Sequence, residues 1–263
     1  MAVTSARNIV NLKEAAGHFE RENARANKYT LADKLPGQLA ELSIRSMSVK
    51  EQPSYTIRKI SPKEKDRMLD FLRKFFFRDE PLNLAVNLLE TPSSRCLELE
   101  EYVAASLDDG VSIAAVDDNG DYVGVVINGL ARREEQDEAD KSSDCPNPKF
   151  KRILQVLSHL EREANIWERL PNTCDTVLEV RIASTHTAWR GRGLMRVLCT
   201  ESERLAKEIG AGGMRMDATS IFSAAAAERL GYKRVYAIEY EKLEFAPQPK
   251  APHIEASVYI KEF

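Results

Sequence analysis

The sequence has few cysteines, and they are scattered. They form no CxxC pair and no tight cluster with histidine, and they are Cys96, Cys145, Cys174 and Cys199. This spacing argues against a zinc site and against a disulfide framework, and it predicts free thiols in a reducing compartment. We therefore expect no bound metal.

Long apolar runs are also missing. No stretch approaches the roughly 18 apolar residues of a membrane-spanning helix. The first residues, MAVTSARNIVNLKEAAGHFER, lack the apolar core of a signal peptide, and their glutamates weaken a transit-peptide interpretation. The sequence thus predicts a soluble, cytoplasmic protein without a membrane partner.

Neither sign of charge dominates. The chain has 38 basic and 41 acidic residues, a net charge of −3, and this balance disfavours a dedicated nucleic-acid binder. Its 43% hydrophobic and 30% charged residues are ordinary for a globular protein. A chain of 263 residues has room for one large domain or two small ones.

The N-terminal residues differ from the rest, because they carry no sustained apolar stripe and Pro36-Gly37 interrupts them. We expect residues 1–53 to form an N-terminal extension, partly helical and partly disordered. Signals of regular structure begin at Ser54, so residues 54–263 are expected to form the folded domain.

In the first half of that domain, the pattern predicts a strand followed by a helix. Residues 55–60 alternate as a half-buried strand does, and Ser61–Glu64 forms a capping box with proline at the first helical position. Apolar residues then recur at helical spacing from Met68 to Phe76. The later elements are a hairpin of Val111–Val116 with Tyr122–Leu130, a loop over Arg132–Pro148 and a helix over Phe150–Ala164.

In the second half, strands alternate with helices. Such alternation predicts a mixed α/β sheet with βαβ crossovers. The expected strands are Val177–Ala183, Met214–Ala218, Lys233–Tyr240 and Ser257–Ile260, and the expected helices are Gly193–Ile209 and Ser223–Leu230.

The most informative segment is Arg190–Arg196, where a glycine-rich turn leads from a strand into a helix. Unpaired backbone N–H groups and the helix dipole favour an anion at such a helix start. Gly191 and Gly193 let the backbone approach a ligand closely, and three arginines add positive charge. A pyrophosphate fits this turn.

Three known phosphate-binding sequence patterns can be compared with this turn. A P-loop needs GxxxxGK[ST], which is absent, and a Rossmann fingerprint needs a third glycine, which the turn lacks. Residues 190–195, RGRGLM, resemble instead the R-x-x-G-x-G/A turn of the GNAT acetyltransferase superfamily, in the leading arginine, the glycines and the strand–loop–helix setting. Met195 departs from that pattern, which has a small residue there. A glycine-rich turn that binds nothing is the remaining alternative.

Other segments narrow the resemblance. Residues 75–83, FFFRDEPLN, resemble the FFxxDEPLN signature of insect-type arylalkylamine N-acetyltransferases. Pro148–Ile153 with Asn165–Trp167 resembles that family's central helix, and Pro249–His253 its closing segment. The resemblance covers roughly Ser54 to Phe263. It implies a GNAT-like α/β fold with a mixed, mostly antiparallel central sheet flanked by helices.

The resemblance also implies a reaction. Acetyl-CoA would donate its acetyl group directly to the primary amine of a small arylalkylamine, of the dopamine, serotonin, tyramine and octopamine class. A protonated amine must lose a proton before it attacks a thioester, and the implied general base is Glu80. Thr219 and Ser223 are the implied proton-relay hydroxyls, although Ser and Thr before a helix are equally ordinary N-caps. The implied substrate-binding residues are Asp79, Pro81 and Leu82.

Acetyl-CoA is implied to bind along one segment of the chain. The end of the strand would hold the pantetheine arm and polarise the thioester carbonyl, and the turn would hold the pyrophosphate. The implied cofactor-binding residues are Ala183, Ser184, Thr185, Arg190, Gly191, Arg192, Gly193, Leu194, Met195 and Arg196. His186 is a weaker candidate for a base. Ala227 stands where many GNAT enzymes have a tyrosine acid, so the thiolate leaves as an anion or another group protonates it.

Two alternatives stay open. One is the same fold acting on polyamines, agmatine or a protein amine. The other is a catalytically silent module that binds acyl-CoA, for which Met195, Thr219 and Ala227 leave room because they depart from the GNAT patterns. The expected partners are acetyl-CoA and a small amine, and the expected oligomeric state is a monomer.

Overall fold

The structure is a computed structural model, and it describes residues 54–135 and 142–263. The extension that the sequence predicts at residues 1–53 lies outside the described residues, as does most of the acidic run after Glu134.

The described residues form a seven-stranded sheet in the order β1-β2-β3-β4-β5-β7-β6. β4 and β5 are parallel neighbours, and every other neighbouring pair is antiparallel. The strands are β1 (Tyr55–Lys59), β2 (Ile113–Asp117), β3 (Tyr122–Arg132), β4 (Thr176–Thr185), β5 (Gly213–Ala218), β6 (Lys233–Glu239) and β7 (Glu255–Glu262). The prediction of a mixed, mostly antiparallel sheet is confirmed.

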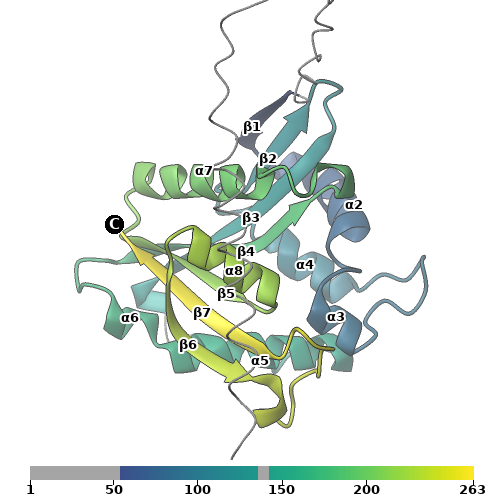
Figure 1. Cartoon of the computed structure of the whole chain (residues 1–263), viewed down its shortest axis with the longest axis vertical. Helices are drawn as coiled ribbons and strands as arrows, with labels where there is room; N and C mark the ends of the chain where they lie inside the picture. Colours follow the sequence, from purple (N-terminus) through teal and green to yellow (C-terminus); the bar gives the residue numbers. More distant parts are fainter. Residues whose placement is uncertain (1–53, 136–141) are drawn as a thin grey trace, which may run out of the picture. The chain divides into compact units, whose positions relative to one another are not determined.

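Helices cover both faces of this sheet. In Figure 1, α8 lies in front of the sheet and α5 behind it. The α-helices of the described residues are α2 (Lys65–Phe75), α3 (Pro81–Ala85), α4 (Leu97–Ala105), α5 (Pro148–Ala164), α6 (Ile166–Arg169), α7 (Leu194–Glu208) and α8 (Ile221–Arg229). The predicted crossovers are present, because α7 connects β4 to β5 and α8 connects β5 to β6.

The predicted capping box is present but opens a tighter turn. The Ser61 side chain accepts a hydrogen bond from Lys63 N, and the Glu64 carboxylate accepts one from Ser61 N. Pro62–Glu64 forms a 3₁₀ turn, and the α-helix starts one residue later, at Lys65. The capping chemistry was therefore predicted correctly, and the first turn is wound more tightly than expected.

Two parts of the first half differ from prediction. The expected loop Arg132–Pro148 starts with the last residue of β3 and a 3₁₀ turn, Arg133–Glu135. Helix α4 was not predicted, because Glu100 interrupts its apolar face. Glu100 is 4% exposed and accepts hydrogen bonds from Arg73 and Arg95, so partners outside its own helix allow a buried charge there.

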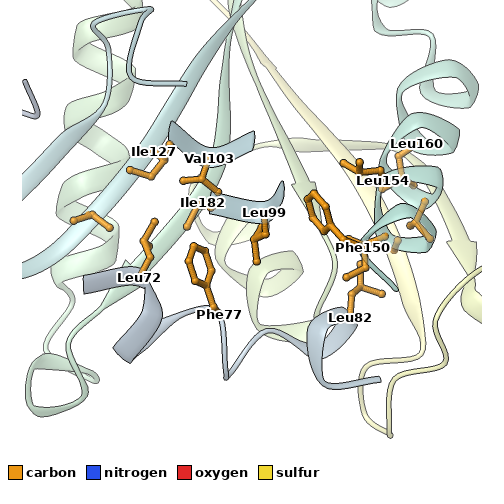
Figure 2. Close-up of a cluster of buried hydrophobic side chains, with 14 of the residues drawn as sticks. Leu72, Phe77, Leu82, Leu99, Val103, Ile127, Phe150, Leu154, Leu160 and Ile182 are labelled. Carbon is orange, nitrogen blue, oxygen red and sulfur yellow. The ribbon is translucent and has the colours of Figure 1, made fainter. Parts of the chain in front are cut away.

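The two faces of the sheet carry separate hydrophobic clusters. One cluster joins α7 and α8 to the sheet, and the other joins α2, α4 and α5 to its opposite face. Figure 2 shows part of the second cluster, with Leu72, Leu99 and Phe150 from three helices lying beside Ile127 and Ile182 from the sheet. This second cluster surrounds the cavity described below.

The parallel strands β4 and β5 separate along their length. They pair from Val177 with Gly213 as far as Val180 with Met216. β4 continues to Thr185, paired there with β3, and β5 continues to Ala218, paired with β7. Beyond Val180 and Met216 the facing edges of these two described strands have no ladder partner, so their backbone N–H and C=O groups need another one.

Helix α7 packs closely on the sheet next to this separation. A Cβ atom on Gly124 of β3 would lie 2.9 Å from Leu198 Cδ1 of α7, closer than real Cβ atoms approach. The glycine therefore allows α7 to lie close to the sheet, and this contact helps to fix the start of α7 at the end of β4.

Candidate active site

The glycine-rich turn has the backbone geometry of an open helix start. Gly191 and Gly193 have φ angles of +75° and +78°, a region that disfavours side chains. Gly193 is the N-cap of α7, and no side chain caps this helix start. The first N–H groups of α7 thus have no capping side chain, and together with the helix dipole they can hold an anion.

The three arginines of the turn do not act alike. Arg190 Nη2 donates to Asp79 Oδ2 at 2.7 Å and to Phe75 O, and its Nε donates to Thr185 O. Arg192 lies 5.6 Å from the Trp189 ring centroid, and Arg196 is exposed on α7. Arg190 therefore joins the glycine-rich turn to the DEPLN segment.

The end of β4 lies where this strand has separated from β5. Ser184 is buried, and its hydroxyl donates to Phe75 O. Ala183 and Thr185 are partly buried. The three residues expected to hold the pantetheine arm are thus at the edge where β4 has lost its pairing with β5.

His186 has a structural use. It caps the 3₁₀ turn Thr187–Trp189, and its Nδ1 accepts a hydrogen bond from Ala188 N at 3.1 Å. Its ring lies 4.3 Å from the Phe75 ring, centroid to centroid. These contacts account for a histidine at this position without a role as a base.

Glu80 is the N-cap of α3, and its carboxylate is held at both oxygens. Oε2 accepts a hydrogen bond from Asn83 N at 2.8 Å, and Oε1 accepts one from the Thr219 hydroxyl at 2.9 Å. Burial raises the pKa of Glu80 above its ordinary value, although these hydrogen bonds act in the opposite direction. Pro81 fills the first helical position of α3, and Glu80 before it has an extended backbone.

Thr219 and Ser223 differ in their contacts. Thr219 bonds to Glu80, and its carbonyl accepts a hydrogen bond from Tyr240 Oη at 2.8 Å. Ser223 forms a reciprocal capping box with Ser220 at the start of α8. The structure thus brings Thr219 to Glu80, whereas Ser223 is the third residue of α8 and bonds to the N-cap of that helix, Ser220.

A cavity of about 180 Å³ opens beside Glu80 and Thr219. Of the predicted substrate-binding residues, Leu82 lines it, whereas Asp79 and Pro81 are not among its lining residues. Asp79 bonds to Arg190 instead. The apolar and aromatic walls of the cavity are formed by Phe76, Leu82, Leu99, Tyr102, Val103, Phe150, Ile153, Leu154, Leu157, Val180 and Ile182.

Besides Glu80, five charged residues line the cavity, and none of them was singled out from the sequence. Glu161 comes from α5. The other four lie on the sheet, and we call them the charged floor: Glu179 and Arg181 of β4 and Arg215 and Asp217 of β5. Burial raises the pKa of Asp217, although the neighbouring Arg215 lowers it. Charges alternating with apolar residues, as in LEVRI and MRMDA, were the available signal, because both faces of a central sheet are normally apolar.

The described part of the chain also bears on metal and membrane binding. It contains no group of three or more His, Cys, Asp or Glu side chains placed to hold a metal ion. None of its helices combines the length and the apolar composition needed to cross a bilayer.

Comparison with known proteins identifies similar structures. Arylalkylamine N-acetyltransferase 2 of Aedes aegypti is 32% identical, with 80% of this chain and 99% of that chain covered and a TM-score of 0.72. A mosquito arylalkylamine N-acetyltransferase like 5b is 22% identical, with 80% and 100% covered and a TM-score of 0.71. The polyamine N-acetyltransferase of Drosophila melanogaster, which forms N-acetylagmatine, is 21% identical, with 80% and 100% covered and a TM-score of 0.71. No protein-family model matches the chain.

Replacing Gly193 by tryptophan should abolish measurable binding of acetyl-CoA, because the indole would cover the first N–H groups of α7. Isothermal titration calorimetry measures this. The matched control is Gly120→Trp, since Gly120 also has a positive φ and open space around it but lies in the β2–β3 turn. Retained affinity in Gly193→Trp would refute the pyrophosphate site, and an equal loss in both variants would trace the effect to backbone strain.

Proposed function

We propose that this chain, which belongs to the insect-type arylalkylamine N-acetyltransferase family of the GNAT fold, acetylates the primary amine of a small arylalkylamine with acetyl-CoA. The acceptors are amines of the dopamine, serotonin, tyramine and octopamine class. One observation carries the proposal. A carboxylate with a raised pKa, Glu80, lies where an apolar, aromatic-lined cavity meets the end of β5, next to the separation of β4 and β5.

Acetyl-CoA is assigned to the glycine-rich turn and the edge of β4. The pyrophosphate would be held by the N–H groups at Gly191–Met195, with Arg192 and Arg196 nearby. The pantetheine arm would run along Ala183–Thr185, whose edge lacks a strand partner. N–H groups of that edge can bond the thioester carbonyl oxygen as negative charge develops on it.

Glu80 is assigned as the general base. It accepts a proton from the ammonium group, directly or through one water, and the neutral nitrogen attacks the thioester carbonyl carbon. The carbon–nitrogen bond forms, the carbon–sulfur bond breaks, and CoA leaves as a thiolate. The second proton that the nitrogen loses passes to this thiolate or to water. A raised pKa makes Glu80 a stronger base than an ordinary carboxylate, and the Thr219 hydroxyl holds it in place. Ser223 fixes the start of α8 behind Thr219.

We propose transfer without an acetylated enzyme. A covalent route needs a nucleophile in the cavity, and none of the four cysteines lines it. Burial also raises the pKa of Cys96 to about 11 and that of Cys199 to about 12, which disfavours their thiolates. The enzyme is proposed to act as a cytoplasmic monomer.

A second candidate function is acetylation of agmatine or polyamines. Two observations favour it, the likeness to the Drosophila polyamine enzyme and the carboxylates of Glu161, Glu179 and Asp217 on the cavity. A thiol-release assay with acetyl-CoA and a panel of arylalkylamines, agmatine and polyamines separates the two. Binding of acetyl-CoA without turnover of any amine would instead support a silent acyl-CoA-binding module.

Glu80→Gln should lower kcat/KM for the preferred amine by about 10²- to 10⁴-fold, because the amide cannot accept the proton. In the unsubstituted enzyme kcat/KM should fall as the pH drops through the raised pKa of Glu80, since only the carboxylate is a base. That fall should disappear in Glu80→Gln. Acetyl-CoA affinity should persist, and Glu90→Gln, an exposed glutamate outside the cavity, is the control. Unchanged turnover would refute Glu80 as the base.

Thr219→Val should move the acidic fall of kcat/KM to higher pH. The lost hydroxyl stabilises the charged form of Glu80, so its removal raises the pKa of Glu80 further. Thr219→Ser keeps the hydroxyl and should keep the profile. The pH dependence of kcat/KM for the three proteins is the measurement, and identical profiles for the valine and serine variants would exclude this role of Thr219.

A further inference from the structure

The charged floor is an unusual feature of the cavity. Its four side chains come from alternating positions of two central strands, on the face of the sheet where the α2, α4 and α5 cluster packs. The Arg215 side chain is only 5% exposed. Charges are rarely buried so deeply unless they are paired, and here they also line a cavity large enough for a ligand.

The charges of the floor balance one another. Arg215 Nε and Nη2 donate to the two oxygens of Asp217 at 2.8 and 2.9 Å. Arg181 Nε and Nη2 both donate to Glu179 Oε2 at 3.2 Å. Arg215 Nη1 lies 3.7 Å from Glu179 Oε1, too far for a hydrogen bond, so this nitrogen retains donors for a ligand oxygen. The carboxylates can in turn accept from a ligand hydroxyl.

The local backbone holds Arg181 in this arrangement. Arg181 is an extra residue of β4, a β-bulge with no partner of its own on β3. Its neighbours do have partners there, because Val180 lies opposite Asn128 and Ile182 lies opposite Ile127. Such a bulge re-aims side chains, and Arg181 and Ile182 both line the cavity. A Cβ atom on Gly129 would lie 2.1 Å from Arg181 Cζ. The guanidinium thus occupies the space that the side chain of any residue other than glycine would need at position 129.

The position of Asp217 along β5 sets the distance between the charged floor and Glu80. Thr219, which bonds to Glu80, and Asp217 are two positions apart at the end of β5, and both line the cavity. Alternate residues of an extended strand are about 6.6 to 6.8 Å apart, close to the span of a two-carbon arm and a benzene ring. An amine at Glu80 would therefore direct its ring along the apolar walls toward Asp217 and Arg215.

We propose that the charged floor recognises a hydroxyl group on the ring of the amine, and so selects hydroxylated arylalkylamines over those with a bare ring. This inference rests on the proposed function. A hydroxyl both donates and accepts, which suits a set of paired guanidinium and carboxylate groups. A bare ring would displace water from the donors and acceptors that these ion pairs leave over, and would leave those atoms without a partner. A second cation would meet two guanidinium groups, each beside its carboxylate, and Glu161 is the cavity's carboxylate outside the floor apart from Glu80.

The first test compares tyramine with phenethylamine, which differ by the ring hydroxyl alone. In the unsubstituted enzyme kcat/KM should favour tyramine by about tenfold or more. Asp217→Asn should reduce this preference, chiefly by raising KM for tyramine, with a smaller effect on kcat/KM for phenethylamine. Asp70→Asn, which breaks an exposed ion pair on α2, is the control. A general loss of structure would lower kcat/KM equally for both amines. The ratio of the two kcat/KM values therefore separates a loss of hydroxyl recognition from a loss of stability.

Gly129→Ala is the second variant, because it displaces Arg181 without removing a charge. It too should reduce the preference for tyramine.

Calorimetry with N-acetyltyramine and N-acetylphenethylamine provides a readout that is independent of turnover. The unsubstituted enzyme should bind N-acetyltyramine more tightly than N-acetylphenethylamine, and the two variants should lose this difference.

Equal kcat/KM for the two amines in the unsubstituted enzyme would overturn the inference and leave the proposed function standing. A preference for agmatine or a polyamine over every arylalkylamine would also overturn it, in favour of a site for a second cation. If no amine is acetylated and neither product binds, the proposed function fails and the inference fails with it.

Discussion

The separation of β4 from β5 is the constraint on which the site depends. The parallel ladder ends at Val180 and Met216, while each strand remains paired on its other side. The unpaired edges need hydrogen-bond partners, and an extended, amide-containing arm such as pantetheine can supply them. Helix α7 starts beside this opening and offers an anion site in line with it. In the proposed complex, one interruption in the sheet would thus provide for both the pantetheine arm and the pyrophosphate of acetyl-CoA.

The carboxylate of Glu80, the proposed base, is subject to opposing influences. Burial raises the pKa of Glu80, and hydrogen bonds from Asn83 and Thr219 limit the rise. The same bonds fix the carboxylate between the turn before α3 and the end of β5. Arg190 adds a link from this turn to the glycine-rich turn through Asp79. Side chains therefore connect the proposed base to the glycine-rich turn.

Local chemistry explains what the sequence predicted. The Ser61 capping box, the β2–β3 hairpin and the β4–α7–β5 crossover each follow from residues close together in the chain, and each is present. The pairing of Glu80 with Thr219 joins residues 139 positions apart, and no local pattern specifies it. The resemblance placed both residues in the site, and the structure supplies the bond between them.

Other parts of the site could not be predicted for the same reason. The charged floor needs the register of β4 beside β5 and the bulge at Arg181, which only the folded sheet determines. A cap and a catalytic role both stayed open for Ser223, because a polar side chain near a helix start suits either use. The capping contact of His186 was not predicted. The hydrogen bonds that each side chain makes in the folded structure distinguish a capping role from a catalytic one.

The account's central claim is that the thioester and the amine meet in one complex at Glu80, with no acetylated enzyme between them. Initial rates measured while both acetyl-CoA and the amine are varied test this most directly. The account predicts intersecting double-reciprocal lines, and mass spectrometry of the enzyme with acetyl-CoA alone should find no acetylated protein. Parallel lines, together with an acetylated enzyme that passes its acetyl group to added amine, would contradict it.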